Sequence, residues 1–219
     1  MKTIAIVSGG MDSITLVYYL KAQGHIVDLM TFNYGQRHRR EINAAHLCAD
    51  DLGLKWNCVD LTALGYLLKG NALSDNTVCV PEGHYADVTM KSTVVHNRNA
   101  VMLSCAVAVA AAREYDAVVI GVHSGDHFIY PDCRPEFIAA FQTMTDAALG
   151  EWRNVQILAP FIDKTKAQIV ALGAELGVPF ADTWSCYNGG SVHCGKCGTC
   201  VERKEAFALA GITDPTVYG

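Results

Sequence analysis

Strand-like and helix-like segments alternate along most of the chain, and no other feature of the sequence limits its fold as strongly. Short apolar runs that predict β-strands occupy residues 4–7, 26–32, 56–61, 117–122 and 155–158. Stretches that favour helices follow them, at residues 12–22, 41–52, 99–115, 135–149, 164–176 and 201–210. Strands separated by helices form βαβ units with parallel pairing. We therefore expect an α/β fold whose mostly parallel, five-stranded sheet is flanked by helices.

The length and composition of the chain fit one main domain with a small appendage. With 219 residues, of which 51% are hydrophobic, the chain can bury a core without disulfide bonds and is not a disordered chain. The one compositional boundary is a tail rich in glycine and cysteine. We expect a main domain over residues 1–180 and a small subdomain over residues 181–219. Residues 62–92, with scattered glycine and proline, should be irregular.

Charge and targeting features narrow the classes of function. Seventeen basic and 22 acidic side chains give a net charge of −5, which disfavours sequence-independent binding to nucleic acid. The longest apolar stretch, residues 100–112, is shorter than the about 20 residues that span a bilayer. The N-terminal apolar run is too short for a signal peptide. We therefore expect a cytoplasmic protein with no membrane partner and no direct nucleic-acid partner.

A glycine-rich loop, SGGMDS at residues 8–13, connects the first predicted strand to the first helix. Gly9 and Gly10 let the backbone curl so that several N–H groups face inward, and the N-terminus of the following helix adds partial positive charge. Ser8 and Ser13 add hydroxyl groups. No Gly-Lys-Ser/Thr follows, so the loop is not a Walker sequence. The pattern indicates an anion cradle, with an ordinary glycine-rich turn as the alternative.

Basic side chains cluster after the second predicted strand, in the segment NYGQRHRR at residues 33–40. Arginine side chains such as Arg37 suit phosphate and carboxylate oxygens. A solvated helix start is the alternative, although basic residues are unfavourable in a first helical turn. We favour an anion-binding role for this segment.

A third candidate segment, YPDCRPEF, lies beyond the fourth predicted strand. Tyr130 and Phe137 offer flat faces for a heterocycle. Asp132 can accept two N–H bonds from a guanine-like edge, and Arg134 can bind a carboxylate. A proline-containing capping turn explains the same residues equally well.

The chain has nine cysteines, an odd number whose distribution does not resemble a disulfide framework. Four of them fall within 15 residues and are interleaved with glycines: Cys186, Cys194, Cys197 and Cys200. Four thiolates at this spacing suit a tetrahedral Zn²⁺ ion, with an iron–sulfur cluster as the less favoured alternative. A closed four-cysteine site has no open coordination position, so we expect one structural zinc per chain. For the isolated Cys133 we favour packing over a nucleophilic role.

Two more basic residues lie at the starts of predicted helices. Arg98 begins the most apolar helix, where its charge is costly unless it has an anionic partner, either a nucleotide phosphate or an internal carboxylate. Lys164 is a candidate phosphate ligand, with a solvated helix face as the alternative. His123 and His127 follow the fourth predicted strand and are expected to line the site or to be structural.

In chain order these segments resemble one family, through SGGMDS, NYGQRHRR, NRN, IYPDCRPEF, TWSCYNG and CGKCGTC. The chain is similar in this respect to the 7-cyano-7-deazaguanine synthase (QueC) family of the ATP-pyrophosphatase (PP-loop) superfamily. The resemblance covers essentially the whole chain. It implies an adenine nucleotide alpha hydrolase-like fold, with the PP-loop domain over residues 1–180 and a zinc-binding subdomain over residues 181–219.

The resemblance also implies an activity. Members of this family are ATP-dependent, Mg²⁺-assisted, zinc-containing ligases of queuosine and archaeosine precursor biosynthesis. The implied substrates are 7-carboxy-7-deazaguanine, ammonia and ATP, and the implied product is 7-cyano-7-deazaguanine, formed through adenylated intermediates. A homodimer is implied as well.

The resemblance assigns roles to individual positions of this sequence. Catalytic roles fall to Ser8, Asp12, Ser13, Arg37 and Lys164. ATP binding falls to Val7, Ser8, Gly9, Gly10, Met11, Asp12, Ser13, Ile14, Thr15, Leu16, Val17 and Arg98. Substrate binding falls to Arg37, His38, Tyr130, Asp132, Arg134 and Phe137. Metal binding falls to Cys186, Cys194, Cys197 and Cys200.

Two departures from the family pattern leave alternatives open. Val95 and His96 precede NRN where the family usually has a proline, and Phe128 and Ile129 precede YPDC where it usually has Ser-Gly. Because Ile129 replaces a small residue beside the expected substrate pocket, a diverged enzyme could stop at the amide or join the activated acid to another amine. A tRNA thiolase and a non-catalytic nucleotide-binding or zinc module are further alternatives, and the net charge argues against the thiolase.

Overall fold

The computed structural model describes residues 1–84 and 90–219 and contains a five-stranded parallel sheet. Its strands follow the order β3-β2-β1-β4-β5. Their bounds are β1 (Lys2–Ile6), β2 (Ile26–Asn33), β3 (Trp56–Asp60), β4 (Ala117–Val119) and β5 (Gln156–Leu158). All of them lie where the sequence predicts strands, so the predicted α/β class and parallel sheet are confirmed.

Each helix predicted from the sequence is present, with ends that shift by three residues or fewer. The helices are α1 (Met11–Ala22), α2 (Arg40–Leu52), α5 (Arg98–Ala112), α6 (Pro135–Leu149), α7 (Lys166–Glu175) and α8 (Gly198–Ala210). A short helix, α3 (Thr62–Leu67), lies where irregular structure was expected. Asp60 Oδ1 accepts a hydrogen bond from Thr62 N at 2.8 Å, and Gly65 lies close against the Tyr34 carbonyl. These contacts hold α3 in place, whereas its sequence has no helical spacing of apolar residues that would have predicted it.

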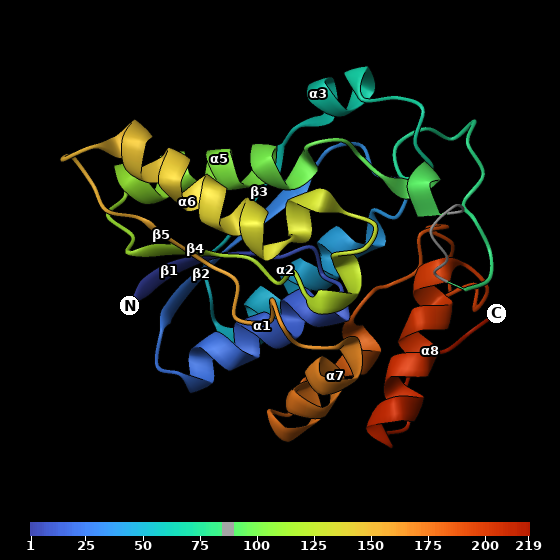
Figure 1. Ribbon diagram of the computed structural model, residues 1–219. Helices are drawn as coiled ribbons and strands as arrows, with labels where there is room; N and C mark the ends of the chain where they lie inside the picture. The colour runs from blue at the N-terminus through green and yellow to red at the C-terminus, as the bar shows by residue number, and fades with distance from the viewer. Residues whose placement is uncertain (85–89) are drawn as a thin grey trace.

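Helices cover both faces of the sheet, as Figure 1 shows for α5 and α6 on one side and α1 and α7 on the other. Alternate residues of β1 enter two separate cores. Ile4 and Ile6 belong to the core under α5, whereas Ala5 and the following Val7 belong to the core beside α1. Because both faces of the sheet are covered here, the run from Ile4 to Val7 is continuously apolar instead of alternating.

The segment Lys91–Ala112 is long and apolar enough to cross a membrane by length and composition alone. It contains a short 3-10 turn, η1 (Lys91–Thr93), and α5. Helix α5 packs against β1 and β4 and buries Met102, Leu103 and Val107. A core helix that covers a sheet has this composition, so the observed packing accounts for the apolar stretch.

The sheet order creates a crevice at the carboxyl end of β1. The chain passes from β1 to β2 on one side, while β4 pairs with β1 on the other side. Connections that leave in opposite directions open a crevice at such a switch point, where ligands of open α/β sheets bind. Here it places residues 8–13, which follow β1, beside residues 120–127, which follow β4.

The C-terminal tail is tied to this crevice. Arg203 of α8 is 1% exposed and donates hydrogen bonds to Phe180 O and Thr183 Oγ1, both at 2.8 Å. Its Nε also pairs with Asp214 at 3.2 Å. The backbone N–H of Trp184 donates to Gly9 O at 2.9 Å. The tail is therefore hydrogen-bonded directly to the glycine-rich loop. The domain boundary expected at residue 180 stays a prediction.

Candidate functional site

A cavity of about 210 Å³ lies at the crevice. Its walls come from the glycine-rich loop, the ends of β2 and β4, the start of α5 and the tail around residues 184–187. Phe32, Tyr34, Met102 and Tyr130 make one part of the wall apolar and aromatic. A cavity that is mainly apolar, with a few convergent polar groups, is typical of a small-molecule site.

The glycine-rich loop, residues 8–13, is held by its own serines. Ser13 Oγ accepts from Gly9 N at 3.1 Å and donates to Gly10 O at 3.0 Å. Ser8 Oγ accepts from Gly10 N at 3.2 Å. Gly10 is the N-cap of α1 and has no side chain to cap it, so the first-turn N–H groups have no side-chain partner at that position. The loop thus has the geometry of an anion cradle.

Gly9 lets this loop approach α2 closely. Its φ is +102°, and a Cβ atom at Gly9 would lie 1.8 Å from the backbone oxygen of Glu41. We predict that Gly9→Ala lowers the free energy of unfolding by about 3 kcal/mol, from the backbone clash and the strained φ together. Gly24→Ala is the matched control, because its φ is +77° with open space around it, and it should cost about 1 kcal/mol. Urea unfolding measures both, and equal losses would contradict the close approach.

A charge cluster lies against the loop and consists of Asp12, His123, Asp126, Lys166 and Glu202. His123 is buried, and the other four side chains are partly buried. Lys166 Nζ is 3.4 Å from Asp12 Oδ2 and 2.6 Å from Glu202 Oε2. His123 Nε2 is 3.7 Å from Asp12 Oδ2 and 3.5 Å from Asp126 Oδ2. His123 Nδ1 accepts from Gly125 N at 3.1 Å, which places a ring proton on Nε2, facing both carboxylates.

The cluster fixes the charges of Asp12 and Lys166. Burial opposes ionisation of Asp12, but Lys166 and His123 outweigh it and lower the pKa of the Asp12 carboxyl below its ordinary value. Burial likewise opposes the Lys166 ammonium, but Asp12 and Glu202 raise the pKa of Lys166 above its ordinary value. Both groups are therefore charged across the physiological pH range, and a partly buried ammonium lines the cavity beside the loop.

The structure separates the two lysines near the start of α7. Lys166 lines the cavity, whereas Lys164 is not among its lining residues. The Lys164 carbonyl accepts from Ser124 N at 3.1 Å and from Ser124 Oγ at 2.8 Å. The catalytic role assigned to Lys164 stays a prediction, and Lys166 is a site residue that the sequence interpretation missed.

The predicted ATP residues divide between the cavity and the core. Val7, Ser8, Gly10, Met11, Asp12, Ser13 and Arg98 line the cavity. The side chains of Ile14, Leu16 and Val17 are buried in the core beside α1, and Thr15 is fully buried without a hydrogen-bond partner for its Oγ1 among the described residues. Gly9 contributes the tight turn.

Of the residues predicted in the basic segment 33–40, one lines the cavity and one lies outside its lining. Arg37 lies outside the cavity lining, and its NH2 group donates to the carbonyls of Asp75 and Val78, both at 2.9 Å. His38 is buried and lines the cavity, with Nε2 3.4 Å from Glu41 Oε1. The roles predicted for Arg37 therefore stay predictions that its present contacts do not support.

Of the predicted substrate residues in the segment 130–137, Tyr130 lines the cavity and Asp132, Arg134 and Phe137 are not among its lining residues. Asp132 Oδ2 accepts from Asn99 N at 3.0 Å and so caps the start of α5. Arg134 Nε donates to His127 O at 2.6 Å. The substrate-binding roles of Asp132, Arg134 and Phe137 therefore stay predictions.

Cys133 lines the cavity but is buried, and Asn99 Nδ2 donates to its sulfur at 3.2 Å. Burial raises the pKa of the Cys133 thiol well above its ordinary value, so the thiol stays protonated. A protonated thiol is a poor nucleophile, which agrees with the packing interpretation.

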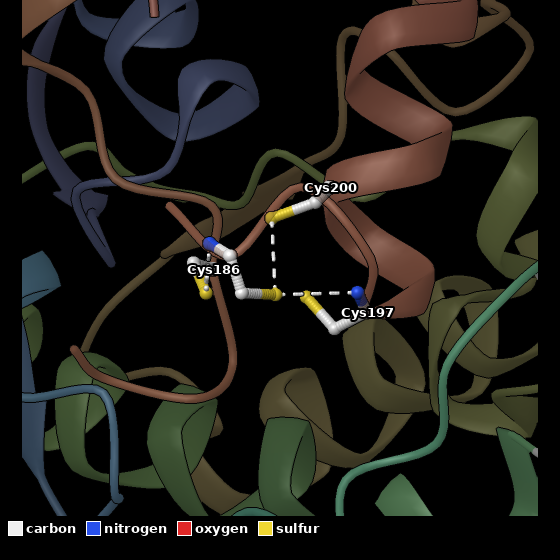
Figure 2. Close-up of side chains that lie close together, drawn as sticks. Cys186, Cys197 and Cys200 are labelled. Atoms are coloured by element: carbon white, nitrogen blue, oxygen red, sulfur yellow. Dashed lines mark hydrogen bonds between the residues drawn. The ribbon is translucent and has the colours of Figure 1, made fainter. Parts of the chain in front are cut away.

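The four cysteines of the tail form a cluster that could hold a metal ion. The side chains of Cys186, Cys197 and Cys200 lie close together in Figure 2, and the sulfurs of these residues and of Cys194 all lie within 4.8 Å of one another. Tetrahedral Zn²⁺ with Zn–S bonds of about 2.3 Å needs sulfurs about 3.8 Å apart. Cys194 and Cys200 sulfurs are 4.0 Å apart. The donor set and its size therefore fit zinc.

Backbone groups around the cluster favour thiolates. Lys196 N and Cys197 N donate to Cys194 Sγ at 3.4 and 3.3 Å, and Cys194 N donates to Cys186 Sγ at 3.4 Å. The adjacent His193 is not a ligand in this arrangement, because its Nε2 accepts from Ser185 N at 3.0 Å. Such N–H···S bonds spread negative charge and support a metal-bound cluster.

Solved structures share the fold of this chain at low sequence identity. An NMN synthetase from Francisella tularensis matches 97% of this chain and 78% of its own, with a TM-score of 0.53 and 15% identity. A predicted subunit of a tRNA methyltransferase from Methanocaldococcus jannaschii matches 80% of this chain and 75% of its own, with a TM-score of 0.51 and 18% identity. Both show the fold alone.

Curated proteins found by sequence are much more similar to this chain in amino-acid identity. Curated proteins named 7-cyano-7-deazaguanine synthase from Rhizobium meliloti and Rhizobium etli are 57% and 56% identical over 218 residues, covering 100% of this chain and 92% of each relative. One from Brucella anthropi is 54% identical and covered to 94%. The family model described as "Queuosine biosynthesis protein QueC" matches residues 2–211. The chain therefore belongs to the QueC family of queuosine biosynthesis proteins.

Proposed function

We propose that this chain is an ATP-dependent 7-cyano-7-deazaguanine synthase that acts on 7-carboxy-7-deazaguanine and ammonia. The observation that carries the proposal is the cavity in which an anion cradle and the partly buried Lys166 ammonium lie beside an aromatic wall. The cradle suits a polyphosphate, and the aromatic wall suits a flat heterocycle. Relatives that are 56% and 57% identical to this chain are named 7-cyano-7-deazaguanine synthase.

The chemistry needs two activations of one carbon atom. A carboxylate oxygen attacks the α-phosphorus of ATP, and pyrophosphate leaves. Ammonia then attacks the acyl carbon, AMP leaves, and a proton is lost to give the amide. The amide oxygen attacks the α-phosphorus of a second ATP, and pyrophosphate leaves. Loss of AMP and of the two nitrogen-bound protons then gives the nitrile. A carboxylate oxygen is a poor leaving group and AMP is a good one, which is the reason for each adenylation.

The residues of the site supply positioning and electrostatic stabilisation for these steps. The first-turn N–H groups of α1 and the loop serines bind phosphate oxygens, and Lys166 stabilises the charge that develops at the α-phosphate. Asp12 and Glu202 hold the Lys166 ammonium in place. Groups fixed before the reaction need no reorganisation during it.

Two carboxylates fit the Mg²⁺ ion that this chemistry uses. Asp12 Oδ1 is buried and has no hydrogen-bond partner among the described residues, and Asp126 lines the same cavity. Carboxylate oxygens are the ligands that Mg²⁺ prefers, so we propose that Asp12 and Asp126 hold it. When bound, the ion neutralises charge on phosphate oxygens.

Zinc in the four-cysteine cluster is proposed to be structural. All four coordination positions would be filled by sulfur, which leaves none for a substrate. We also propose that the chain forms a homodimer, that it is cytoplasmic and that its main domain ends at residue 180. Light scattering of the purified chain measures the oligomeric state.

A product assay tests the proposed function. The purified chain is incubated with 7-carboxy-7-deazaguanine, ATP, Mg²⁺ and ammonium, and products are followed by mass spectrometry. We expect the nitrile, with the amide as a transient intermediate and one AMP released for each activation. Accumulation of the amide alone, or of a conjugate with another amine, would favour the diverged enzyme. ATP turnover without any of these products would exclude the whole class.

A further inference from the structure

Arg98, the first residue of α5, is a cation of the cavity without an anionic partner. Its NH1 group donates to the hydroxyl of Tyr34 at 3.2 Å, and its guanidinium lies 5.8 Å from the centre of the Tyr34 ring. Among the residues that the structure describes, no carboxylate lies within ion-pair distance of it. By contrast, the buried Arg203 is neutralised by Asp214. A guanidinium in a cavity wall without a counter-ion is costly, and an anionic ligand relieves that cost.

The position of Arg98 is fixed by the start of its helix. Asn97 adopts a left-handed conformation with φ 59°, and Asn99 N donates to the carboxylate of Asp132. Arg98 N itself donates to Val95 O at 3.2 Å. The guanidinium therefore stands on a helix end that is already ordered, as a pre-organised binding group requires.

Tyr34 adds a second donor beside the guanidinium. Burial raises the pKa of Tyr34 to about 12, so its hydroxyl stays protonated at physiological pH. Because the hydroxyl oxygen accepts the bond from Arg98, its hydrogen is available to donate to another group. Together the two side chains offer an anion one cationic and one neutral donor.

The surroundings of this pair select the kind of anion. Met102 lies one turn after Arg98 on the same face of α5, and Phe32 and Tyr130 also line the cavity. Phosphate oxygens already have the loop and Lys166, and Met11 and Ile14 of the helix that follows the loop belong to the other core of the sheet. An apolar and aromatic wall that ends in a guanidinium suits a flat heterocycle bearing one carboxylate.

We propose that Arg98, with Tyr34, binds the carboxylate of the acceptor substrate and so sets the preference for the acid in the first activation. This inference rests on the proposed function and deepens it. The substrate of the first activation is an anion, whereas the substrate of the second is a neutral amide. A guanidinium and a carboxylate attract each other as opposite charges and can form two parallel hydrogen bonds, whereas a neutral amide offers one oxygen and no net charge. Loss of Arg98 must therefore harm the first activation more than the second.

The test supplies the acid and the amide separately to Arg98→Gln, with ATP, Mg²⁺ and ammonium. We expect kcat/KM for the acid to fall about 100-fold, in line with loss of a charge-assisted interaction, and kcat/KM for the amide to fall less than about 5-fold. KM for ATP should stay unchanged. Calorimetric titration of the acid without ATP should show weaker binding by a similar factor.

Two further variants keep the test decisive if Arg98→Gln folds poorly. Arg98→Lys keeps the charge and should recover part of the activity on the acid, and Tyr34→Phe should lose about 10-fold on the acid because only a neutral donor is removed. Equal losses on acid and amide, or a higher KM for ATP with the acid unaffected, would overturn the proposal. If the wild-type chain converts neither the acid nor the amide, the proposed function itself has failed.

Discussion

Lys166→Met will lower ATP-dependent turnover about 10³-fold, as expected for removal of a positioned charge beside a reacting phosphate. Lys164→Met will leave most of the turnover intact. Lys166 Nζ lies between Asp12 and Glu202 in the cavity wall, while the described hydrogen bonds of Lys164 are made by its backbone N–H and carbonyl. Pyrophosphate release, followed together with nitrile formation, measures both variants. The two lysines are neighbours in the sequence and thus form a matched pair.

Loss of folding must be separated from loss of chemistry in this test. Removing Lys166 takes its ammonium away from the partly buried carboxylates of Asp12 and Glu202, which we expect to cost about 3 kcal/mol of stability. Glu202→Gln in the Lys166→Met background removes one of these carboxylates, so it should recover much of the stability but none of the turnover. Turnover that returns with stability would show that Lys166 only supports the fold.

The choice between these two lysines shows where the sequence interpretation reached its limit. The sequence showed two lysines near the start of α7, but we did not work out from it that Lys164 lies before the helix and Lys166 within its first turn. Thr165 and Gln168 form a capping box, with Gln168 Oε1 accepting from Thr165 N at 2.8 Å. This S/T-x-x-Q pattern was visible in the sequence and would have put Lys166 on the first turn.

Other parts of the site depend on contacts between distant residues, which a sequence pattern does not contain. Arg37 is bound by two backbone carbonyls about 40 residues away in the sequence, in a segment expected to be irregular. Asp132 caps α5, which begins more than 30 residues earlier. In contrast, the glycine-rich loop, the parallel strands and the four-cysteine cluster arise from local spacing and apolar runs, and all of these were predictable.

Removal of the metal proposed for the four-cysteine cluster is expected to disturb the glycine-rich loop as well as the tail. Trp184 connects them, because its backbone N–H donates to Gly9 O at 2.9 Å and its indole N–H donates to Cys186 O at 2.8 Å. Its ring also lies 4.2 Å from that of His193, next to Cys194. Structural zinc sites supply folding free energy directly, so removing the ion should release this whole segment.

We therefore expect Cys197→Ser to lose its zinc, to melt at least about 5 °C lower and to lose ATP turnover. Cys58→Ser is the matched control, because Cys58 is exposed and lies outside the cluster, and it should keep all three properties. Metal analysis, thermal unfolding and the emission of Trp184, isolated by comparison with Trp184→Phe, measure the effect. If the emission and the melting temperature stay unchanged after complete removal of the ion, the metal does not hold the tail on the loop. The hydrogen bonds of Arg203 and of the Trp184 backbone would then do so, because they come from α8 and the backbone and not from the cysteines.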